Sequence, residues 1–433
     1  MTLRIVEWAM LGNAARADLL SRPAFADADL AATVTGILDE VRNEGDAALR
    51  RLTARLDGVD LDRLELDEAA IVQGAARLGA DDRAAIDAAI ATLTAFHDAG
   101  RTQPYEMETA TGVRCARVIR PIDSVGLYVP GGSAPLPSTV LMLGVPSRLA
   151  GNPLRLLCTP PRPDGSVHPA ILYAAQACGI TRVFRIGGAQ AIAALAFGTE
   201  SVPRVAKLFG PGNAWVTEAK RQVALDPRGA HADLPAGPSE LMVVADAGAN
   251  ASFIAADLLS QAEHGPDSQV LLVTDAPALA AAVAAEVGRQ LTHLPRRGIA
   301  SRALAASRAL IVSNLDEAME VANRYAPEHL VIATEHADDR VAAVTNAGSV
   351  FLGNWTPEAL GDYCSGTNHV LPTYGHARAC SGLAVADFEK RITVQRATAA
   401  GLRGIGPVAV ALARMEGLDA HARAVEVRLD ECG

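Results

Sequence analysis

Hydrophobic residues along the first hundred positions recur with the period of an α-helix. The clearest stripe occupies positions i, i+3, i+4 and i+7, at Val34, Ile37, Leu38 and Val41. Gly45 offers a stop to this helix, and Asp46 restarts a second one. Thr111 and Gly112 separate two strand-like runs at 106–110 and 113–119, which predicts a hairpin there.

From about residue 128 the pattern changes to short, continuous apolar runs separated by Ala-rich helical stretches. The runs lie at 154–158, 183–186, 205–209, 241–245, 270–274, 310–313, 330–333 and 349–352. Strands of this kind, separated by helices of ten or more residues, are typical of parallel sheets that are covered on both faces. The number of such units favours two sheets, so we expect an α/β fold with two lobes.

Gly- and Pro-rich stretches indicate how the chain divides. VPGGSAP and DLPAGPS bracket residues 128–239, which we expect to form a smaller α/β lobe inserted into a larger lobe of residues 25–127 and 240–380. Residues 1–24 are expected to form an N-terminal helical segment. Residues 381–433 are predicted to be a helical tail, with Pro407 in a first turn and Gly417 ending that helix. The apolar positions of this tail must be buried on its own body or on a partner subunit.

Composition excludes several classes of function. The 433 residues carry 39 basic and 49 acidic side chains, a net charge of −10 that gives no long-range attraction for nucleic acid or an anionic membrane. No run of about 18 apolar residues occurs, and polar residues interrupt the N-terminal apolar stretch, so neither a membrane span nor a signal peptide is expected. The six cysteines include no CxxC pair. These features predict a reduced, cytoplasmic, globular protein.

The loop FGPGNAW at 209–215 lies between a predicted strand and a predicted helix, where a dinucleotide fingerprint would occur. Trp215 occupies the position of the third glycine, so the pattern G-x-G-x-x-G is not satisfied. Two interpretations remain open, a structural turn and a looser phosphate contact at a helix start.

Two short constellations could perform chemistry. Gln261 and His264 lie three residues apart at the end of a helix and share one face, which could supply two metal ligands or could be a solvated helix end. Glu328 and His329 precede the apolar run at 330–333, where they could form an acid–base couple or be an exposed dipeptide.

The segment GDYCSGTNH at 361–369 is polar and has no regular period, as is typical of functional loops on α/β scaffolds. It offers Asp362 and His369 as a metal ligand and a substrate contact. In the tail, Glu416 and His421 flank the break at Gly417.

A cysteine nucleophile is an alternative chemistry that the composition allows. Cys158 lies inside an apolar run typical of a core strand. No histidine lies near Cys115 in the sequence to generate a thiolate, although a distant base could do so.

Taken together, several segments resemble the histidinol dehydrogenase family. They are SVGLYVPGGSAPLPSTVLMLGVPSRLAG, KLFGPGNAWVTEAKRQV, DLPAGPSELMVVAD, DLLSQAEHGPDSQV, YAPEHL and GDYCSGTNHVLPTYG, and the resemblance runs in order from about Ala24 to the C-terminus. It implies a zinc-dependent, NAD-linked oxidation of L-histidinol to L-histidine, the last step of histidine biosynthesis. Two successive hydride transfers would pass through L-histidinal, with two NAD and one zinc per site. The resemblance also implies two Rossmann-like lobes, which are incomplete dinucleotide folds, in an intertwined homodimer.

The resemblance assigns roles to the residues that match the family's motifs. The implied zinc ligands, which would also contact the substrate, are Gln261, His264, Asp362 and His421. The implied catalytic residues are His329 as the base of both oxidations and Glu328 as the activator of water. Further implied substrate contacts are Ser239, Glu416 and His369, and the implied NAD contacts are Tyr128, Gln190 and Asn213. Because the tail crosses the dimer interface in this family, His421 and Glu416 would serve the neighbouring site.

Two alternatives of function are weighed against this one. A two-lobed ligand-binding protein without catalysis would suit lobes that close about a hinge, but it gives Glu328 and His329 no role. A relative that oxidises another polar alcohol is the alternative within the family, against which the matching Glu416 and His421 argue. Cys364 departs from the family pattern, in which a small residue is expected, and a thiol there would add sensitivity to oxidation.

Overall fold

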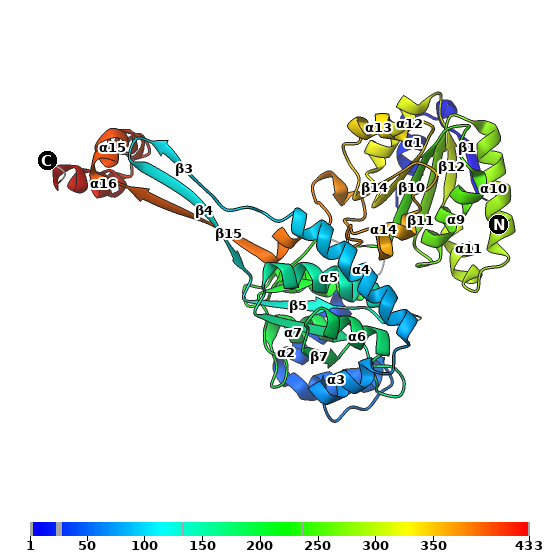
Figure 1. Cartoon of the computed structure of the whole chain (residues 1–433), viewed down its shortest axis with the longest axis horizontal. Helices are drawn as coiled ribbons and strands as arrows, with labels where there is room; N and C mark the ends of the chain where they lie inside the picture. The colour runs from blue at the N-terminus through cyan, green and yellow to red at the C-terminus, as the bar shows by residue number, and fades with distance from the viewer. Residues whose placement is uncertain (1–2, 23–27, 132–133, 235–236, 432–433) are drawn as a thin grey trace.

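The computed structural model describes residues 3–22, 28–131, 134–234 and 237–431. It consists of two lobes, each built on a six-stranded sheet, and an arm that projects away from both lobes (Figure 1). We call the lobe at the upper right of Figure 1 lobe I and the lobe below it lobe II.

Lobe I contains a fully parallel sheet in the order β1-β12-β11-β10-β13-β14. Its strands are β1 (Arg4–Glu7), β10 (Glu240–Ala245), β11 (Gln269–Thr274), β12 (Arg308–Ile311), β13 (His329–Ala333) and β14 (Ser349–Leu352). Its helices are α1 (Asn13–Leu19), α9 (Ala251–Ala262), α10 (Pro277–Leu291), α11 (Arg297–Ala305), α12 (Leu315–Tyr325), α13 (Ala337–Arg340) and α14 (Glu358–Tyr363). Helices α9, α10 and α11 bury one face of the sheet and α1 and α12 bury the other, which explains why the strands are apolar throughout.

Lobe II contains a second sheet in the order β2-β7-β6-β5-β8-β9, which is parallel except for the pair β2–β7. Its strands are β2 (Glu65–Leu66), β5 (Ser124–Tyr128), β6 (Leu154–Thr159), β7 (Arg182–Arg185), β8 (Lys207–Phe209) and β9 (His231–Ala232). Its helices are α2 (Ala28–Leu56), α3 (Glu68–Ala75), α4 (Ala80–Ala99), α5 (Pro137–Ala150), α6 (Pro169–Ala177), α7 (Gly188–Phe197) and α8 (Ala214–Leu225). One face packs against α2, α7 and α8, and the other packs against α3 to α6.

The arm is a three-stranded antiparallel sheet capped by two helices. Its strands, in the order β15-β4-β3, are β3 (Tyr105–Ala110), β4 (Val113–Pro121) and β15 (Glu389–Ala397). Helices α15 (Ala399–Met415) and α16 (Asp419–Glu431) pack against each other at its far end, beside the C-terminus (Figure 1). Short 3₁₀ turns complete the described elements, at Trp8–Met10, Val341–Ala343, His376–Arg378 and Val385–Phe388.

Several expectations from the sequence are confirmed. The apolar runs form the strands of two sheets, and Gly112, with φ at 75°, turns the hairpin between β3 and β4. Helix α2 departs from helical backbone angles at Gly45, where φ is 53° and ψ is −131°, so the chain restarts at Asp46 as predicted.

The division of the chain differs from the one expected. Residues 28–99 join the sheet of residues 124–232, because α2 packs on α7, α3 on α6 and α4 on α5. They do not join residues 240–352, although 25–127 and 240–380 were expected to form one lobe. Residues 1–24 are not only helical, since β1 is an edge strand of lobe I. The helical period fixes which face of α2 is buried, but it does not say which sheet covers that face.

The tail also differs from its expected helical form. Residues from Glu389 form strand β15, which pairs along its whole length with β4. Pro407 lies inside α15 instead of in its first turn, because the helix already begins at Ala399 behind the Thr398 cap. Gly417 follows the end of α15, as predicted. Among the helices of the described ranges, none has the length and apolar character needed to cross a membrane.

A substitution at Gly45 tests the break in α2. A Cβ atom there would lie 2.2 Å from Oε2 of Glu200, the oxygen that accepts a hydrogen bond from the Asp46 amide. The backbone angles of Gly45 also disfavour any side chain. We expect Gly45→Ala to lower the free energy of unfolding by about 1–3 kcal/mol in denaturant titrations.

Gly36 is the matched control, because it lies in the same helix and a Cβ atom there would have no neighbouring heavy atom within 4 Å. Gly36→Ala should leave the free energy of unfolding unchanged or raise it by up to about 1 kcal/mol. Equal effects of the two substitutions would contradict a special role for Gly45.

Candidate functional site

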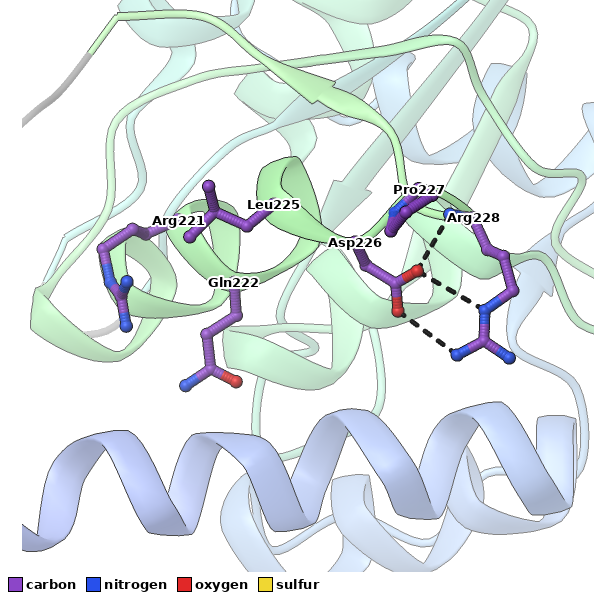
Figure 2. Close-up of a pocket in the computed structure, with 6 residues that line it drawn as sticks. All are labelled: Arg221, Gln222, Leu225, Asp226, Pro227 and Arg228. Atoms are coloured by element: carbon purple, nitrogen blue, oxygen red, sulfur yellow. Dashed lines mark hydrogen bonds and ion pairs between the residues drawn. The ribbon is translucent and has the colours of Figure 1, made fainter.

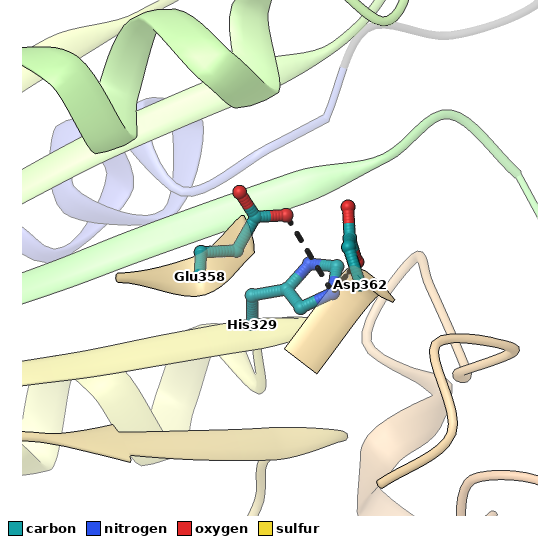
Figure 3. Close-up of side chains that lie close together, drawn as sticks. All are labelled: His329, Glu358 and Asp362. Carbon is teal, nitrogen blue, oxygen red and sulfur yellow. Dashed lines mark ion pairs between the residues drawn. The ribbon is translucent and has the colours of Figure 1, made fainter. Parts of the chain in front are cut away.

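A cluster of ionisable side chains lies at the amino ends of β10 and β13 in lobe I. His329 is the first residue of β13, and its Nε2 atom lies 3.6 Å from Oδ1 of Asp362 and 3.9 Å from Oε1 of Glu358. One ligand atom from each of these three residues lies within 4.8 Å of the others (Figure 3). All three side chains are buried, so the cluster is screened from bulk water.

The local fold explains why these side chains meet. Glu358 and Asp362 are four residues apart on α14, which places them on one face of that helix. His329 is held from the other side, because its Nδ1 lies 3.1 Å from the carbonyl oxygen of Glu240 on β10. The amide of Glu240 donates to Oε2 of Glu328 at 2.8 Å. With Nδ1 directed at a carbonyl, Nε2 is the nitrogen that faces the carboxylates.

The carboxylates and the imidazole shift one another's ionisation. Burial opposes a charge on His329, but neighbouring Glu328 and Asp362 outweigh it and raise the pKa of His329 to about 10. Burial would raise the pKa of Asp362, but the nearby His329 lowers it to about 2. Burial raises the pKa of Glu328 and of Glu358 to about 8. Asp362 therefore keeps a negative charge in a dry site, with His329 as its counter-charge.

Gln261, at the end of α9, contributes two polar atoms that have no partner among the described residues. The side chain is fully buried, and in that part of the chain neither its Oε1 nor its Nε2 makes a hydrogen bond. Oε1 of Glu358 is likewise buried without a hydrogen bond, while its Oε2 accepts one from Ser260 at 3.0 Å. Buried polar atoms are almost always satisfied, so orphaned ones point to a ligand that completes them.

His264 lies just beyond α9, and its Nε2 is 3.9 Å from Oδ2 of Asp362. His264 and His329 thus approach Asp362 from the end of α9 and from β13, and Gln261 lies on α9 three residues before His264. An amide oxygen, imidazoles and a carboxylate form a donor set that suits a divalent cation such as zinc. The residues present fit a metal ion, and the full burial of Gln261 argues against a merely solvated helix end.

The loop that follows Asp362 docks on lobe II. Nδ1 of His369 lies 2.8 Å from the carbonyl oxygen of Asp362, and its Nε2 lies 3.5 Å from the Thr139 hydroxyl on α5. Asn368 donates to the Met142 carbonyl at 2.8 Å and lies 3.4 Å from Nε2 of His97 on α4. This loop therefore connects the cluster of lobe I with two helices of lobe II.

The predicted NAD contacts lie at the carboxyl ends of the lobe II strands. Tyr128 ends β5, and its hydroxyl accepts a hydrogen bond from the Gly188 amide at 3.1 Å. Gln190 on α7 is buried, and its Oε1 has no hydrogen-bond partner. Asn213 caps α8 by accepting from the Val216 amide at 3.2 Å. In this sheet the chain order reverses between β5 and β8, the position where open α/β sheets bind ligands.

An acidic residue that the sequence did not single out lies beside Gln190. Oδ2 of Asp57 is 3.5 Å from Nε2 of Gln190. Burial raises the pKa of Asp57 to about 6. Its oxygens are acceptors for hydroxyl groups, which is a common use of an acid in nucleotide sites.

Three other predicted site residues lie in different surroundings. Ser239 immediately precedes β10, next to Glu240. Glu416 and His421 are exposed on the arm, at α15 and α16, far from the cluster within the same chain (Figure 1). The structure of one chain brings His264 and His329 to Asp362, with Gln261 buried on α9 nearby in the sequence, and it does not bring His421 to them.

Neither cysteine weighed as a nucleophile lies in the cluster. Cys158 is fully buried in β6, where burial raises the pKa of its thiol, and Cys115 lies on β4 of the arm. Cys364 is exposed at the end of α14, two residues after Asp362.

A surface cavity elsewhere contains none of the predicted site residues. It lies at the end of α8, above α2, and Asp226 and Arg228 interact across it (Figure 2). It is lined by Arg221, Gln222, Leu225, Asp226, Pro227 and Arg228.

Glu358 is the residue of the cluster that the sequence reasoning missed. A signal was present, because Glu358 and Asp362 have the i, i+4 spacing that places two carboxylates on one helix face. The six-residue helix α14 is too short for the hydrophobic period to reveal it.

Comparisons with known proteins identify the family of the chain. The sequence model of the histidinol dehydrogenase family matches residues 20–429. The chain is 57% identical over 429 residues to the histidinol dehydrogenase of Xanthomonas oryzae pv. oryzae, with 99% of each chain covered. It is 52% identical over 426 residues to that of Pectobacterium atrosepticum, covering 98% of this chain and 96% of the relative.

A solved structure gives the same result for the fold. The crystal structure of histidinol dehydrogenase from Elizabethkingia anophelis superposes with a TM-score of 0.95 at 43% identity, covering 99% of this chain and 98% of that one. The resemblance inferred from the motifs is therefore confirmed, and the chain belongs to the histidinol dehydrogenase family of oxidoreductases.

Proposed function

We propose that this protein oxidises L-histidinol to L-histidine through L-histidinal, with NAD as the hydride acceptor and one zinc ion per site. The observation that carries the proposal is the buried contact of Asp362 with His329, together with the buried, unsatisfied amide of Gln261, in a chain of this family. The unsatisfied amide of Gln261 has no role in a folded chain that binds nothing there.

Gln261, His264 and Asp362 would hold the zinc ion, and His421 of the partner subunit would complete the set. When bound, the ion would supply positive charge next to the carboxylate of Asp362 and orient the substrate. That charge would relieve His329 of its role as the counter-ion of Asp362 and so favour the neutral imidazole.

His329 would act as the base in both oxidations. Its Nδ1 is directed at the Glu240 carbonyl, so Nε2 is the atom that accepts the proton of the alcohol as hydride leaves. In the second oxidation the same atom would accept a proton from the hydrated aldehyde. Glu328 lies beside it, with one oxygen held by the Glu240 amide, and would activate the water that adds to the aldehyde.

NAD would bind at the crevice between β5 and β8, with Tyr128, Gln190 and Asn213 as its contacts. The free Oε1 of Gln190 and the reversal of strand order support this position. Ser239, Glu416 and His369 would add contacts to the substrate. His369 already lies between Asp362 and lobe II, where the two ligands must meet.

A homodimer with shared sites would account for the arm. Large apolar side chains are exposed along it, at Ile392, Val394, Val408, Leu412 and Met415. An exposed patch of this kind favours a protein partner. A second copy would bury it and would carry His421 and Glu416 to the neighbouring cluster. The cytoplasmic location and the absence of nucleic-acid and membrane partners stay predictions.

Turnover of L-histidinol tests the proposal directly. The zinc-loaded protein should form two NADH for each histidine produced, and amino alcohols without an imidazole should give far less. His329→Asn should lower this rate by at least about 100-fold, because the base is lost, while the zinc content stays at the wild-type level. Absence of histidinol turnover would overturn the proposed function, and loss of zinc from the variant would contradict the assignment of His329 as base.

Gln261→Leu should separate metal binding from folding. Removal of a buried, unsatisfied amide should leave the metal-free protein as stable or more stable, by up to about 1–3 kcal/mol. Zinc affinity should fall at least about tenfold, because an oxygen ligand is lost. Chelator titration measures the affinity, and denaturant unfolding of the metal-free protein measures the stability.

Gln269→Leu is the matched control for this substitution. Gln269 is also buried, but its amide donates to the carbonyls of Ser21 and Ala306 and accepts from the Tyr325 hydroxyl. We expect this variant to be destabilised and to keep its zinc affinity. A Gln261→Leu protein with unchanged zinc affinity would remove Gln261 from the set of ligands.

His421→Asn should release zinc more readily than the wild type, although the mutated residue lies far from the cluster of its own chain. Mixing this variant with His329→Asn should restore activity. Half of the randomly reassociated dimers are mixed and each has one intact site of two, so about one quarter of the wild-type activity is expected. No recovery after proven subunit exchange would contradict sites shared between chains.

A further inference from the structure

A buried ion pair lies directly behind the candidate base and its neighbour. Nε and Nη2 of Arg22 bond the two carboxylate oxygens of Glu240, a bidentate contact whose side chains are 11% and 2% exposed. Arg22 follows α1, whereas Glu240 is the first residue of β10, so the pair joins segments that are 218 positions apart. Bidentate pairs of this kind fix orientation as well as charge.

The backbone of Glu240 holds both members of the Glu328–His329 couple. Its amide donates to Oε2 of Glu328 at 2.8 Å, and its carbonyl oxygen lies 3.1 Å from Nδ1 of His329. The position of Glu240 therefore sets the direction of the carboxylate and of the imidazole together. A contact to Nδ1 also decides which ring nitrogen is available on the other side.

Arg22 holds the chain that leads into the same couple. Its Nη2 donates to the carbonyls of Tyr325 at 2.9 Å and Ala326 at 3.3 Å, and its guanidinium lies 4.0 Å above the Tyr325 ring. Ala326 ends α12 in the left-handed region, two residues before Glu328. Arg22 thus contacts both β10, through Glu240, and the bend at Ala326. The Glu328–His329 couple is held between these two segments.

Residues with unusual backbone angles bond the Arg22–Glu240 pair. In the described part of the chain, the residues other than glycine with positive φ are Ala326 and Tyr374, both at 55°. Arg22 bonds the carbonyl of Ala326, and the amide of Tyr374 donates to Oε1 of Glu240 at 2.8 Å. Such angles persist where the surroundings impose them, and they concentrate at functional sites.

We propose that Arg22 and Glu240 are positioning residues for the reaction, whose ion pair fixes the orientation of Glu328 and His329 toward the substrate. The inference rests on the proposed function, since it assigns the couple a catalytic role. Neither residue touches the substrate. The pair acts through the amide and carbonyl of Glu240 and through the bend at Ala326.

A purely structural role is the competing explanation, and lobe II supplies a matched control for it. Arg182 and Glu65 form a second bidentate pair, with contacts of 2.6 and 2.9 Å, between β7 and β2. Arg182 also donates to a carbonyl and lies near an aromatic ring, those of Ser201 and Phe184. It differs from Arg22 in its partners: Glu240 bonds Glu328 and His329, whereas among the described residues neither Glu65 nor Ser201 makes such a bond.

The test compares Arg22→Met, Arg22→Lys and Arg182→Met as zinc-loaded proteins, below their unfolding temperatures. Arg22→Met should lower kcat at least about 100-fold, because small displacements of catalytic groups are costly, with zinc content and the KM for NAD within about twofold of wild type. Arg22→Lys should recover part of the loss, since it keeps the charge but not the bidentate fork. Arg182→Met should lower the unfolding temperature and leave kcat within about twofold.

A kcat within twofold of wild type for Arg22→Met, or an equal loss of kcat for Arg182→Met, would overturn the proposal. Glu240→Gln serves if Arg22→Met does not fold: its kcat should fall at least about tenfold, and an unchanged kcat would again overturn it. Crystal structures of the wild type and of a folded variant provide a test that does not depend on enzyme activity. The contact between His329 and the Glu240 carbonyl should be lost in the variant, and its retention would contradict positioning even if the wild type proved inactive on histidinol.

Discussion

The site depends on how the folded chain stabilises carboxylates that are buried away from water. Glu328, Glu358 and Asp362 are all buried around the single imidazole of His329. Isolated buried carboxylates are expensive, so each must be protonated, paired or bound to a cation. The raised pKa values of Glu328 and Glu358 favour their protonated forms, which is the first solution. The lowered pKa of Asp362 reflects its pairing with His329, which is the second. A divalent cation beside Asp362 would be the third solution, and it would free the imidazole for the proposed proton transfer.

In the proposed reaction the two lobes would contribute different ends of their sheets. In lobe I the cluster lies at the amino ends of β10 and β13, whereas in lobe II the candidate nucleotide contacts lie at the carboxyl ends of the strands, where the order reverses between β5 and β8. Hydride transfer requires direct contact between substrate and nucleotide, so the lobes must hold a fixed relation. The loop after Asp362 supplies it, since Asn368 bonds α5 and Gly366 leaves no room for a side chain beside Thr92 and Phe96 of α4. The proposed metal ligand Asp362 and the docking contacts are thus only a few residues apart.

Much of the fold could be predicted from the sequence because it rests on local patterns. Continuous apolar runs predicted the strands, since both faces of each sheet are covered. The lobe that receives α2 to α4 could not be predicted, because the helical period reports a buried face and not its partner. Strand β15 was missed for a related reason: its side chains are mostly exposed, and its pairing with β4 is a contact over more than 250 residues.

The candidate site could likewise be predicted only in part from the sequence. Spacing alone brought together Gln261 with His264 and Glu328 with His329, but each pair was ambiguous. Family motifs, and not spacing, joined these pairs to Asp362. Their convergence depends on three separate elements, which no local pattern encodes. Arg22 and Glu240 carried no sequence signal at all, because an ion pair across 218 positions has no period.

Assembly and metal binding are coupled by thermodynamic necessity if His421 comes from the partner. A cation that binds the dimer more tightly than the monomer must strengthen the dimer by the same factor. Two features of the single chain are consistent with this coupling. Buried polar atoms of Gln261 and Glu358 lack hydrogen bonds among the described residues, and apolar side chains of the arm are exposed. Each of these features destabilises the isolated, metal-free chain. In the proposed dimer both would be relieved in the one state in which cation, partner and nucleotide lobe are together, so the competent enzyme would also be the most stable arrangement of its parts.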